Sequence, residues 1–269
     1  MDDLSIDVLV NKENMLSIDY IPKNMYIVDN NDNNFHNYLI DNIKPMLRME
    51  VKPYIEKLIY DANKSGIVII VDSAFRSSAY QQMILDKLIS EKGNEAYKLI
   101  ALPGASEHQT GLAVDFAIYE NGIYNDDIKE EDKEAIWLKD NAWKYGFILR
   151  YPKGKENITG YNFEPWHYRL VGLELAKQLY EQDITLEEYY RICRNIKKIR
   201  KEKYREFKKL GSNSTINPYT TENIAALLDY NHTHYKRFES ENDSTKKMPL
   251  KKIVLLSIIL ETSIEDLMK

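Results

Sequence analysis

Two histidines and two carboxylates stand in short segments whose residue types could assemble a hydrolytic metal site. His108 and Asp115 lie seven residues apart with Gly111 between them, and Glu164 precedes His167 by three. A hydrolytic zinc ion takes three protein ligands, leaves one position open for water, and works beside a carboxylate that does not bind it. His108, Asp115 and His167 could be the ligands, since imidazole favours zinc over magnesium or calcium. Their spacing predicts a loop ligand and a strand ligand, not the i, i+4 helical pair of an H-E-x-x-H protease.

Each of these residues also has a simpler interpretation. His108 taken alone could be an ordinary loop histidine, and Asp115 a turn carboxylate. An aspartate inside the apolar run 112–118 nevertheless needs a partner, which favours the metal site.

Glu164 is the predicted general base, taking a proton from water and passing it to the leaving amine. Residues three apart in a strand point to opposite faces, but Pro165 permits a bend that turns Glu164 and His167 the same way. The alternative is a carboxylate that only orients His167. Trp166 is expected to be a packed wall of the site.

Three polar side chains complete the predicted site. Arg76 follows an apolar strand, where its guanidinium could hold the oxygen that becomes negative in a tetrahedral intermediate. The alternative for Arg76 is a surface salt bridge. Gln81 and Ser106 could donate or accept neutral hydrogen bonds with a substrate carboxylate.

The sequence pattern around these residues predicts an α+β fold, in which helices flank a small antiparallel sheet. Helical spacing and buried β-branched runs give the assignments. The predicted helices are 45–62, 78–91, 135–145 and 171–181, and the predicted strands are 67–71, 112–118, 147–149 and one that begins at 165. Extended entry segments at 9–12 and 20–22, a turn at 29–34, a surface excursion at 120–134 and a loop at 153–160 complete the expectation.

Several separated motifs, in order, resemble the zinc D,D-peptidases of vancomycin resistance, the VanY and VanXY type. The resemblance covers roughly residues 9–189, and the matching stretches are 73–77, 101–115, 146–152, 158–160, 164–169 and 185–189. Ala74-Phe75 stands where Gly-Tyr is more usual before the arginine, a departure that we expect to be tolerated.

This resemblance implies a zinc carboxypeptidase, with one Zn²⁺ per chain, that removes the terminal D-Ala of peptidoglycan precursors and can also split free D-Ala-D-Ala. It implies zinc held by His108, Asp115 and His167, with Glu164 as base and Arg76 at the oxyanion. Gln81 and Ser106 fall where family members contact the substrate.

Composition and charge indicate a globular protein with two different units. Apolar residues make up 43% and charged residues 29% of 269 residues. The acidic start lacks a secretory pattern, no apolar run approaches the roughly 20 residues of a membrane span, and a single cysteine excludes an internal disulfide. These features predict a cytoplasmic protein without membrane contact, as in the VanXY branch. Through residue 188 the chain has 20 basic and 32 acidic residues, a net −12, whereas the remainder has 17 and 10, a net +7.

We therefore predict a peptidase domain over 1–188 and an all-α domain over 189–269. The second domain resembles a Cro/repressor-type helix-turn-helix, with helices expected at 196–203, 221–228 and 232–238 and closing helices within 250–267. A polar segment at 211–219 and Tyr230 in place of a turn glycine depart from that pattern. The residues from 210 onward are nearly balanced in charge, so docking or homodimerisation is favoured over sequence-specific DNA binding.

Two other functions remain open at this point. The peptidase-like unit could sense a cell-wall fragment while the tail binds an operator, although a sensor needs no Glu164. A phage-type L,D-endopeptidase lysin is the second alternative, but its tail would be expected to bind cell wall.

Overall fold

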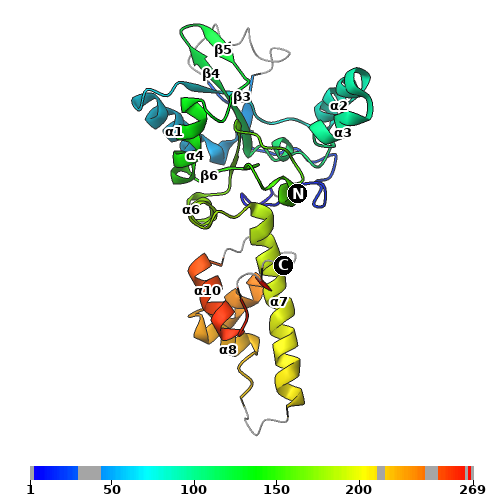
Figure 1. The fold of residues 1–269 in the computed structure, drawn as a ribbon, viewed down its shortest axis with the longest axis vertical. Coiled ribbons are helices and arrows are strands. Elements are labelled where there is room, and N and C mark those ends of the chain that lie inside the picture. The colour runs from blue at the N-terminus through cyan, green and yellow to red at the C-terminus, as the bar shows by residue number, and fades with distance from the viewer. Residues whose placement is uncertain (1–2, 30–43, 211–215, 240–247, 264–265, 268–269) are drawn as a thin grey trace. The chain divides into compact units, whose positions relative to one another are not determined.

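The computed structural model describes residues 3–29, 44–210, 216–239, 248–263 and 266–267, which divide into two compact units, Met1–Glu181 and Gln182–Lys269 (Figure 1). Residue 188, the predicted end of the first domain, lies in the first turn of helix α7 (Leu186–Lys209). Helix α7 begins at Leu186 because Thr185 and Glu188 form a capping box, in which each side chain accepts a hydrogen bond from the other residue's backbone N–H.

The first unit is built on antiparallel sheets flanked by helices, which confirms the predicted α+β class. The main sheet has the order β3-β4-β7-β6, with β5 paired to β4, and a separate pair joins β1 to β2. The strands are β1 (Met25–Ile27), β2 (Met46–Arg48), β3 (Ile69–Ser73), β4 (Ala113–Glu120), β5 (Ile123–Asn125), β6 (Phe147–Leu149) and β7 (His167–Leu170).

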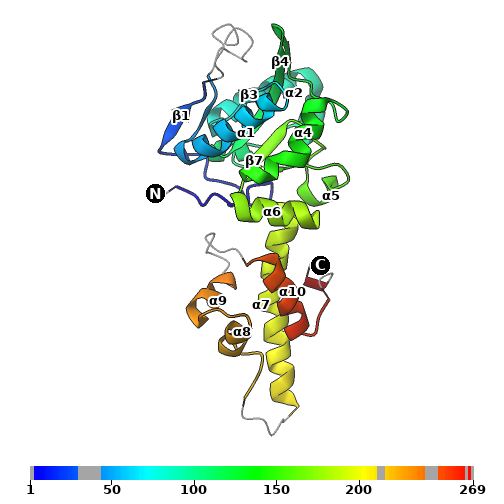
Figure 2. The same cartoon turned by 90° about the vertical axis from the view of Figure 1, so that its left-hand side faces the viewer.

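Helices lie on both sides of this sheet (Figures 1 and 2), with α1 and α4 on one side and α2 and α3 on the other. The α-helices are α1 (Lys52–Lys64), α2 (Ser78–Lys92), α3 (Ala96–Leu99), α4 (Lys133–Asn141), α5 (Glu156–Thr159) and α6 (Leu173–Gln182). Short 3-10 turns are η3 (Met49–Val51), η4 (Gly93–Glu95), η5 (Glu107–Thr110) and η6 (Ala142–Tyr145).

The core of the unit lies between the sheet and the α1/α4 layer. Ile55 and Leu58 of α1 share one buried cluster with Val114 and Phe116, alternate residues of β4, and all four are at most 1% exposed. Because side chains alternate along a strand, Asp115 points away from this core, toward the other face of the sheet. Burial of one strand face thus directs the candidate ligand to the opposite face.

Three expectations about local structure were wrong. The helix predicted from residue 45 begins only at Lys52, since Met46–Arg48 pairs with β1 and Pro53 fits only the first helical turn. The predicted surface excursion 120–134 contains β5, joined to β4 through Asn121-Gly122 with both φ angles positive, as a tight hairpin turn requires. It also contains the fully buried Ile128. The predicted loop 153–160 contains α5.

The described residues of the second unit form α7, α8 (Thr221–Leu227), α9 (His232–Phe238) and α10 (Leu250–Ile259). Predicted helix 196–203 is the middle of the much longer α7. In the turn between α8 and α9, Asp229 takes the positive φ of 55° that a glycine would otherwise supply. Arg200 of α7 is bound by Glu239 and by the carbonyl of Tyr219. Closing helices were predicted within 250–267, and α10 ends at Ile259. Ile264, in the same predicted segment, falls outside the described residues.

In the part of the chain that the structure describes, no helix is both long and apolar enough to cross a membrane.

Candidate active site

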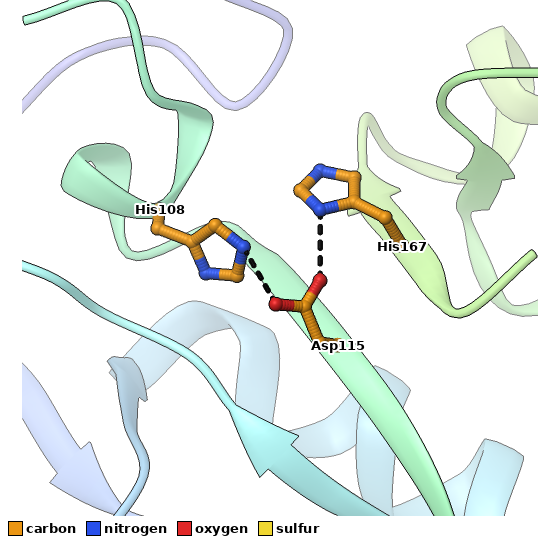
Figure 3. A group of neighbouring side chains, drawn as sticks. All are labelled: His108, Asp115 and His167. Atoms are coloured by element: carbon orange, nitrogen blue, oxygen red, sulfur yellow. Dashed lines mark hydrogen bonds and ion pairs between the residues drawn. The ribbon is translucent and has the colours of Figure 1, made fainter. Parts of the chain in front are cut away.

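The three predicted metal ligands converge from three segments (Figure 3). Asp115 of β4 and His167 of β7 are register partners on neighbouring antiparallel strands. His108 comes from η5, which starts after the extended Ser106 and ends at Gly111, a left-handed residue with φ 69°. One nitrogen of each histidine and one oxygen of Asp115 lie within 4.8 Å of one another. The structure therefore brings together the set that spacing predicted.

The Asp115 carboxylate faces both imidazoles, one oxygen to each. Its Oδ2 lies 3.1 Å from Nε2 of His108 and its Oδ1 lies 2.8 Å from Nδ1 of His167. Nδ1 of His108 lies 2.5 Å from the Ala74 carbonyl, so it carries the proton and donates. Nε2 of His108 is then a bare lone pair, buried and without a hydrogen-bond partner among the described residues. A cation bound between these atoms would satisfy that nitrogen.

The charges of Asp115 and His108 suit a cation, whereas His167 carries a proton that a metal must displace. Burial alone would raise the pKa of Asp115, but the two histidines hold it well below its usual range. Burial lowers the pKa of His108 to about 4, so this ring is neutral at pH 7. Burial opposes protonation of His167 too, but the hydrogen bond to Asp115 and the nearby carboxylate of Glu107 raise its pKa to about 9. A metal would have to displace that proton, which makes binding stronger as pH rises.

Glu164 stands beside the ligands in the position expected of a base. Residues 164–167 form a turn through Pro165, closed by the His167 N–H donating to the Glu164 carbonyl at 3.2 Å. The turn brings Oε2 of Glu164 to 3.8 Å from Nδ1 of His167, nearer than a straight strand would allow. Burial raises the pKa of Glu164 to about 7, against the opposing influence of His167 and Arg76. Trp166 packs against the core.

The remaining predicted residues line one cavity of about 50 Å³ together with His108, His167 and Glu164. Arg76, Gln81 and Ser106 all contribute to its wall. The buried Nε of Arg76 and Oε1 of Gln81 have no hydrogen-bond partner among the described residues, while Nε2 of Gln81 donates to the Ala101 carbonyl at 2.8 Å. Unsatisfied buried polar atoms that line a cavity are available to a ligand.

Sequence reasoning missed a charged cluster beneath the site. Glu107 and the strand-associated Arg150 and Arg169 are fully buried and form ion pairs of 2.8 and 2.9 Å. Burial alone would raise the pKa of Glu107, but the two guanidiniums hold it far below its usual range. Arg169 could have pointed to this cluster, because it is a charged residue within a predicted strand. A buried charge needs a partner, and this rule was applied to Asp115 but not to Arg169. Tyr151 and Tyr161, which line the cavity, carried no such signal.

Comparison with known proteins places this fold and site in a family. Residues 44–173 match the model of the VanY family, described as D-alanyl-D-alanine carboxypeptidase. The Bacillus subtilis protein YodJ is 39% identical over 71% of this chain and 69% of its own length. VanXYC of Enterococcus gallinarum, a bifunctional D-Ala-D-Ala dipeptidase and carboxypeptidase, is 32% identical over 68% of this chain and 92% of its own.

Solved structures agree. The LD-carboxypeptidase LdcB is 38% identical with a TM-score of 0.59, covering 68% of this chain and 84% of its own. A VanY D,D-pentapeptidase variant from a VanB-type resistance cassette, in complex with Zn(II), is 32% identical with a TM-score of 0.57, covering 68% and 97%. The chain belongs to the VanY family of D-alanyl-D-alanine carboxypeptidases. The predicted family and enzyme class are thereby confirmed, whereas the family model ends before the second unit and does not address it.

Proposed function

We propose that the first unit is a zinc-dependent D,D-carboxypeptidase acting on D-Ala-D-Ala-terminated peptidoglycan precursors in the cytoplasm, and on the free dipeptide. Such activity would support glycopeptide resistance by removing the D-Ala-D-Ala terminus. The observation that carries this proposal is the convergence of His108, Asp115 and His167 with the non-ligating Glu164 beside them. The zinc-bound VanY structure and the D,D activities named for VanXYC support it.

In this proposal one zinc ion, held by His108, Asp115 and His167, supplies Lewis acidity toward water and the scissile carbonyl. Glu164 accepts the proton of the attacking water and transfers it to the amine that leaves as D-Ala. Arg76, whose guanidinium lines the cavity, stabilises the negative oxygen of the tetrahedral intermediate. Gln81 and Ser106 bind the substrate carboxylate through neutral hydrogen bonds.

A second candidate is L,D-carboxypeptidase activity, which removes the last D-Ala of a tetrapeptide stem. It is supported by the LD-carboxypeptidase structure LdcB at 38% identity, above the 32% of the zinc-bound VanY structure. The two activities differ in whether the residue before the scissile bond has D or L configuration. The cavity wall on that side, rather than the metal site, must therefore decide between them.

A panel of three substrates tests both candidates. D-Ala release is measured from a pentapeptide ending in D-Ala-D-Ala, from free D-Ala-D-Ala and from a tetrapeptide ending in an L,D bond. The D,D proposal predicts release from the pentapeptide, with the dipeptide reporting bifunctionality. Release from the tetrapeptide alone would replace it with the L,D activity.

For the second unit we propose docking or homodimerisation rather than sequence-specific DNA binding. Two histidines of α9 are engaged within the unit. Nε2 of His232 lies 3.0 Å from Glu222, and the ring of His234 stacks on Tyr230. Light scattering and a mobility-shift assay at two salt concentrations test this assignment. A salt-resistant, sequence-selective shift would establish the DNA-binding alternative instead.

A further inference from the structure

Glu107 is a buried carboxylate whose orientation is fixed from one side only. Its Oε1 accepts from Nε of Arg150 at 2.8 Å and from Nη1 of Arg169 at 2.9 Å, and all three side chains are fully buried. Arg169 is itself anchored, because its Nη2 donates to the carbonyls of Ile6 and Val8. Two donors on one oxygen prevent the carboxylate from rotating, so the direction of the other oxygen is set.

That other oxygen is aimed at a metal ligand. Oε2 of Glu107 lies 3.7 Å from Nε2 of His167, and neither atom has a hydrogen-bond partner among the described residues. This separation exceeds a hydrogen bond by about half an ångström. Both atoms are buried, and leaving a buried donor or acceptor unmatched is unfavourable. Each is therefore the natural partner of the other.

The state of His167 decides whether they can pair. His167 turns Nδ1 toward Asp115 and the ligand cluster (Figure 3). An imidazole that binds a cation through Nδ1 keeps its proton on Nε2, which is then a donor. A carboxylate oxygen is the matching acceptor, whereas it would repel the lone pair of the opposite tautomer.

We propose that Glu107 is a positioning residue that holds His167 in its metal-binding tautomer and ring orientation, with Arg150 and Arg169 as its anchors. This links the N-terminal segment at Ile6 and Val8 through Arg169 and Glu107 to a metal ligand. The inference rests on the proposed zinc site. It assigns to Glu107 an effect on zinc affinity and on one proton, separate from catalysis.

The first test measures zinc dissociation constants by competition with a chromogenic chelator. Glu107→Gln keeps the shape, but its amide cannot accept from two arginines and from His167 at once. We expect zinc binding to weaken about 10- to 100-fold. Glu134→Gln is the matched control, since Glu134 is 3% exposed on α4 and does not line the cavity. It should bind zinc within about twofold of wild type.

The second test observes the proton of His167 directly. NMR of the zinc-loaded wild type should place the His167 proton on Nε2 and show it exchanging slowly with water, and Glu107→Asp, which keeps the charge one methylene shorter, should exchange faster. A proton on Nδ1 of His167, or a folded Glu107 variant with unchanged zinc affinity, would overturn the inference. A wild type that binds no zinc would instead refute the proposed function.

Discussion

Replacing Glu164 by Gln should remove the base while leaving the metal ligands in place. Proton transfer by a positioned base contributes about 10²- to 10⁴-fold, or roughly 3–5 kcal/mol of barrier. We therefore expect kcat/KM to fall by that factor. Zinc affinity should stay close to wild type, since Glu164 does not belong to the cluster of His108, Asp115 and His167.

The pH dependence of kcat/KM in the wild type also tests whether Glu164 is the base. Burial raises the pKa of Glu164 to about 7 in the metal-free site. A neighbouring cation favours the carboxylate, so the pH at which kcat/KM reaches half of its plateau should lie at or below 7. Only ionised Glu164 can accept a proton, so kcat/KM should rise with pH and then level off. With a pKa of 7, activity at pH 6 would be about one-tenth of the plateau.

The assay is D-Ala release from the pentapeptide between pH 5 and 9, for wild type, Glu164→Gln and Glu156→Gln. Glu156 begins α5 and does not line the cavity, so its variant should keep the wild-type profile. The reasoning fails if Glu164→Gln retains more than about a tenth of wild-type kcat/KM. A wild-type profile in which activity rises only well above pH 7 would contradict it equally.

Three further predictions concern stability, each measured by denaturant unfolding. Burial raises the pKa of Asp72 to about 6, so the folded state holds its proton longer than the unfolded chain, and this group's contribution to stability falls as pH rises from about 4 to 6. Asp72→Asn should therefore gain stability relative to wild type over that window, by on the order of 2–3 kcal/mol, and an unchanged difference between pH 4 and 7 would refute this. Gly146→Ala should cost more than about 2 kcal/mol, because φ is 81° and a Cβ would lie 3.1 Å from backbone atoms of Gly172 and Leu173 at the start of α6. Gly66→Ala, where φ is 74° and an added Cβ would have no atom within 4 Å, should cost only about 1–2 kcal/mol. Equal losses of stability in the two variants would show that the backbone contact at Gly146 does not matter. Glu239→Ala should destabilise the second unit by about 3 kcal/mol through the buried charge left on Arg200, with D-Ala release unchanged; parallel loss of activity would show that the two units are coupled.

The candidate ligands could be predicted because their chemistry constrains sequence locally. An aspartate in an apolar strand, a histidine in a loop and a histidine at the start of a strand demand an explanation, and the register of β4 and β7 places Asp115 opposite His167. The resemblance to known peptidases then supplied roles that spacing alone left open. The two-residue period of side chains in a strand was sufficient to predict that Asp115 lies on the face opposite Val114 and Phe116.

What could not be predicted depends on contacts between distant segments. Met46–Arg48 has apolar spacing compatible with a helix, but it pairs with Met25–Ile27, which only tertiary structure decides. Glu107 carries no local sign of its two arginine partners, 43 and 62 residues away. The hairpin at Asn121-Gly122, in contrast, could have been predicted, because this dipeptide is typical of a hairpin turn. It was missed because the polar residues around it favoured a surface loop.

The most direct test of the central claim is a zinc titration of chelator-stripped protein, with D-Ala release from the D-Ala-D-Ala pentapeptide as the readout. The account predicts no release without metal and a linear rise that saturates at one zinc per chain. It also predicts no restoration in a His167→Ala variant. Release that is undiminished by complete metal removal would contradict the account.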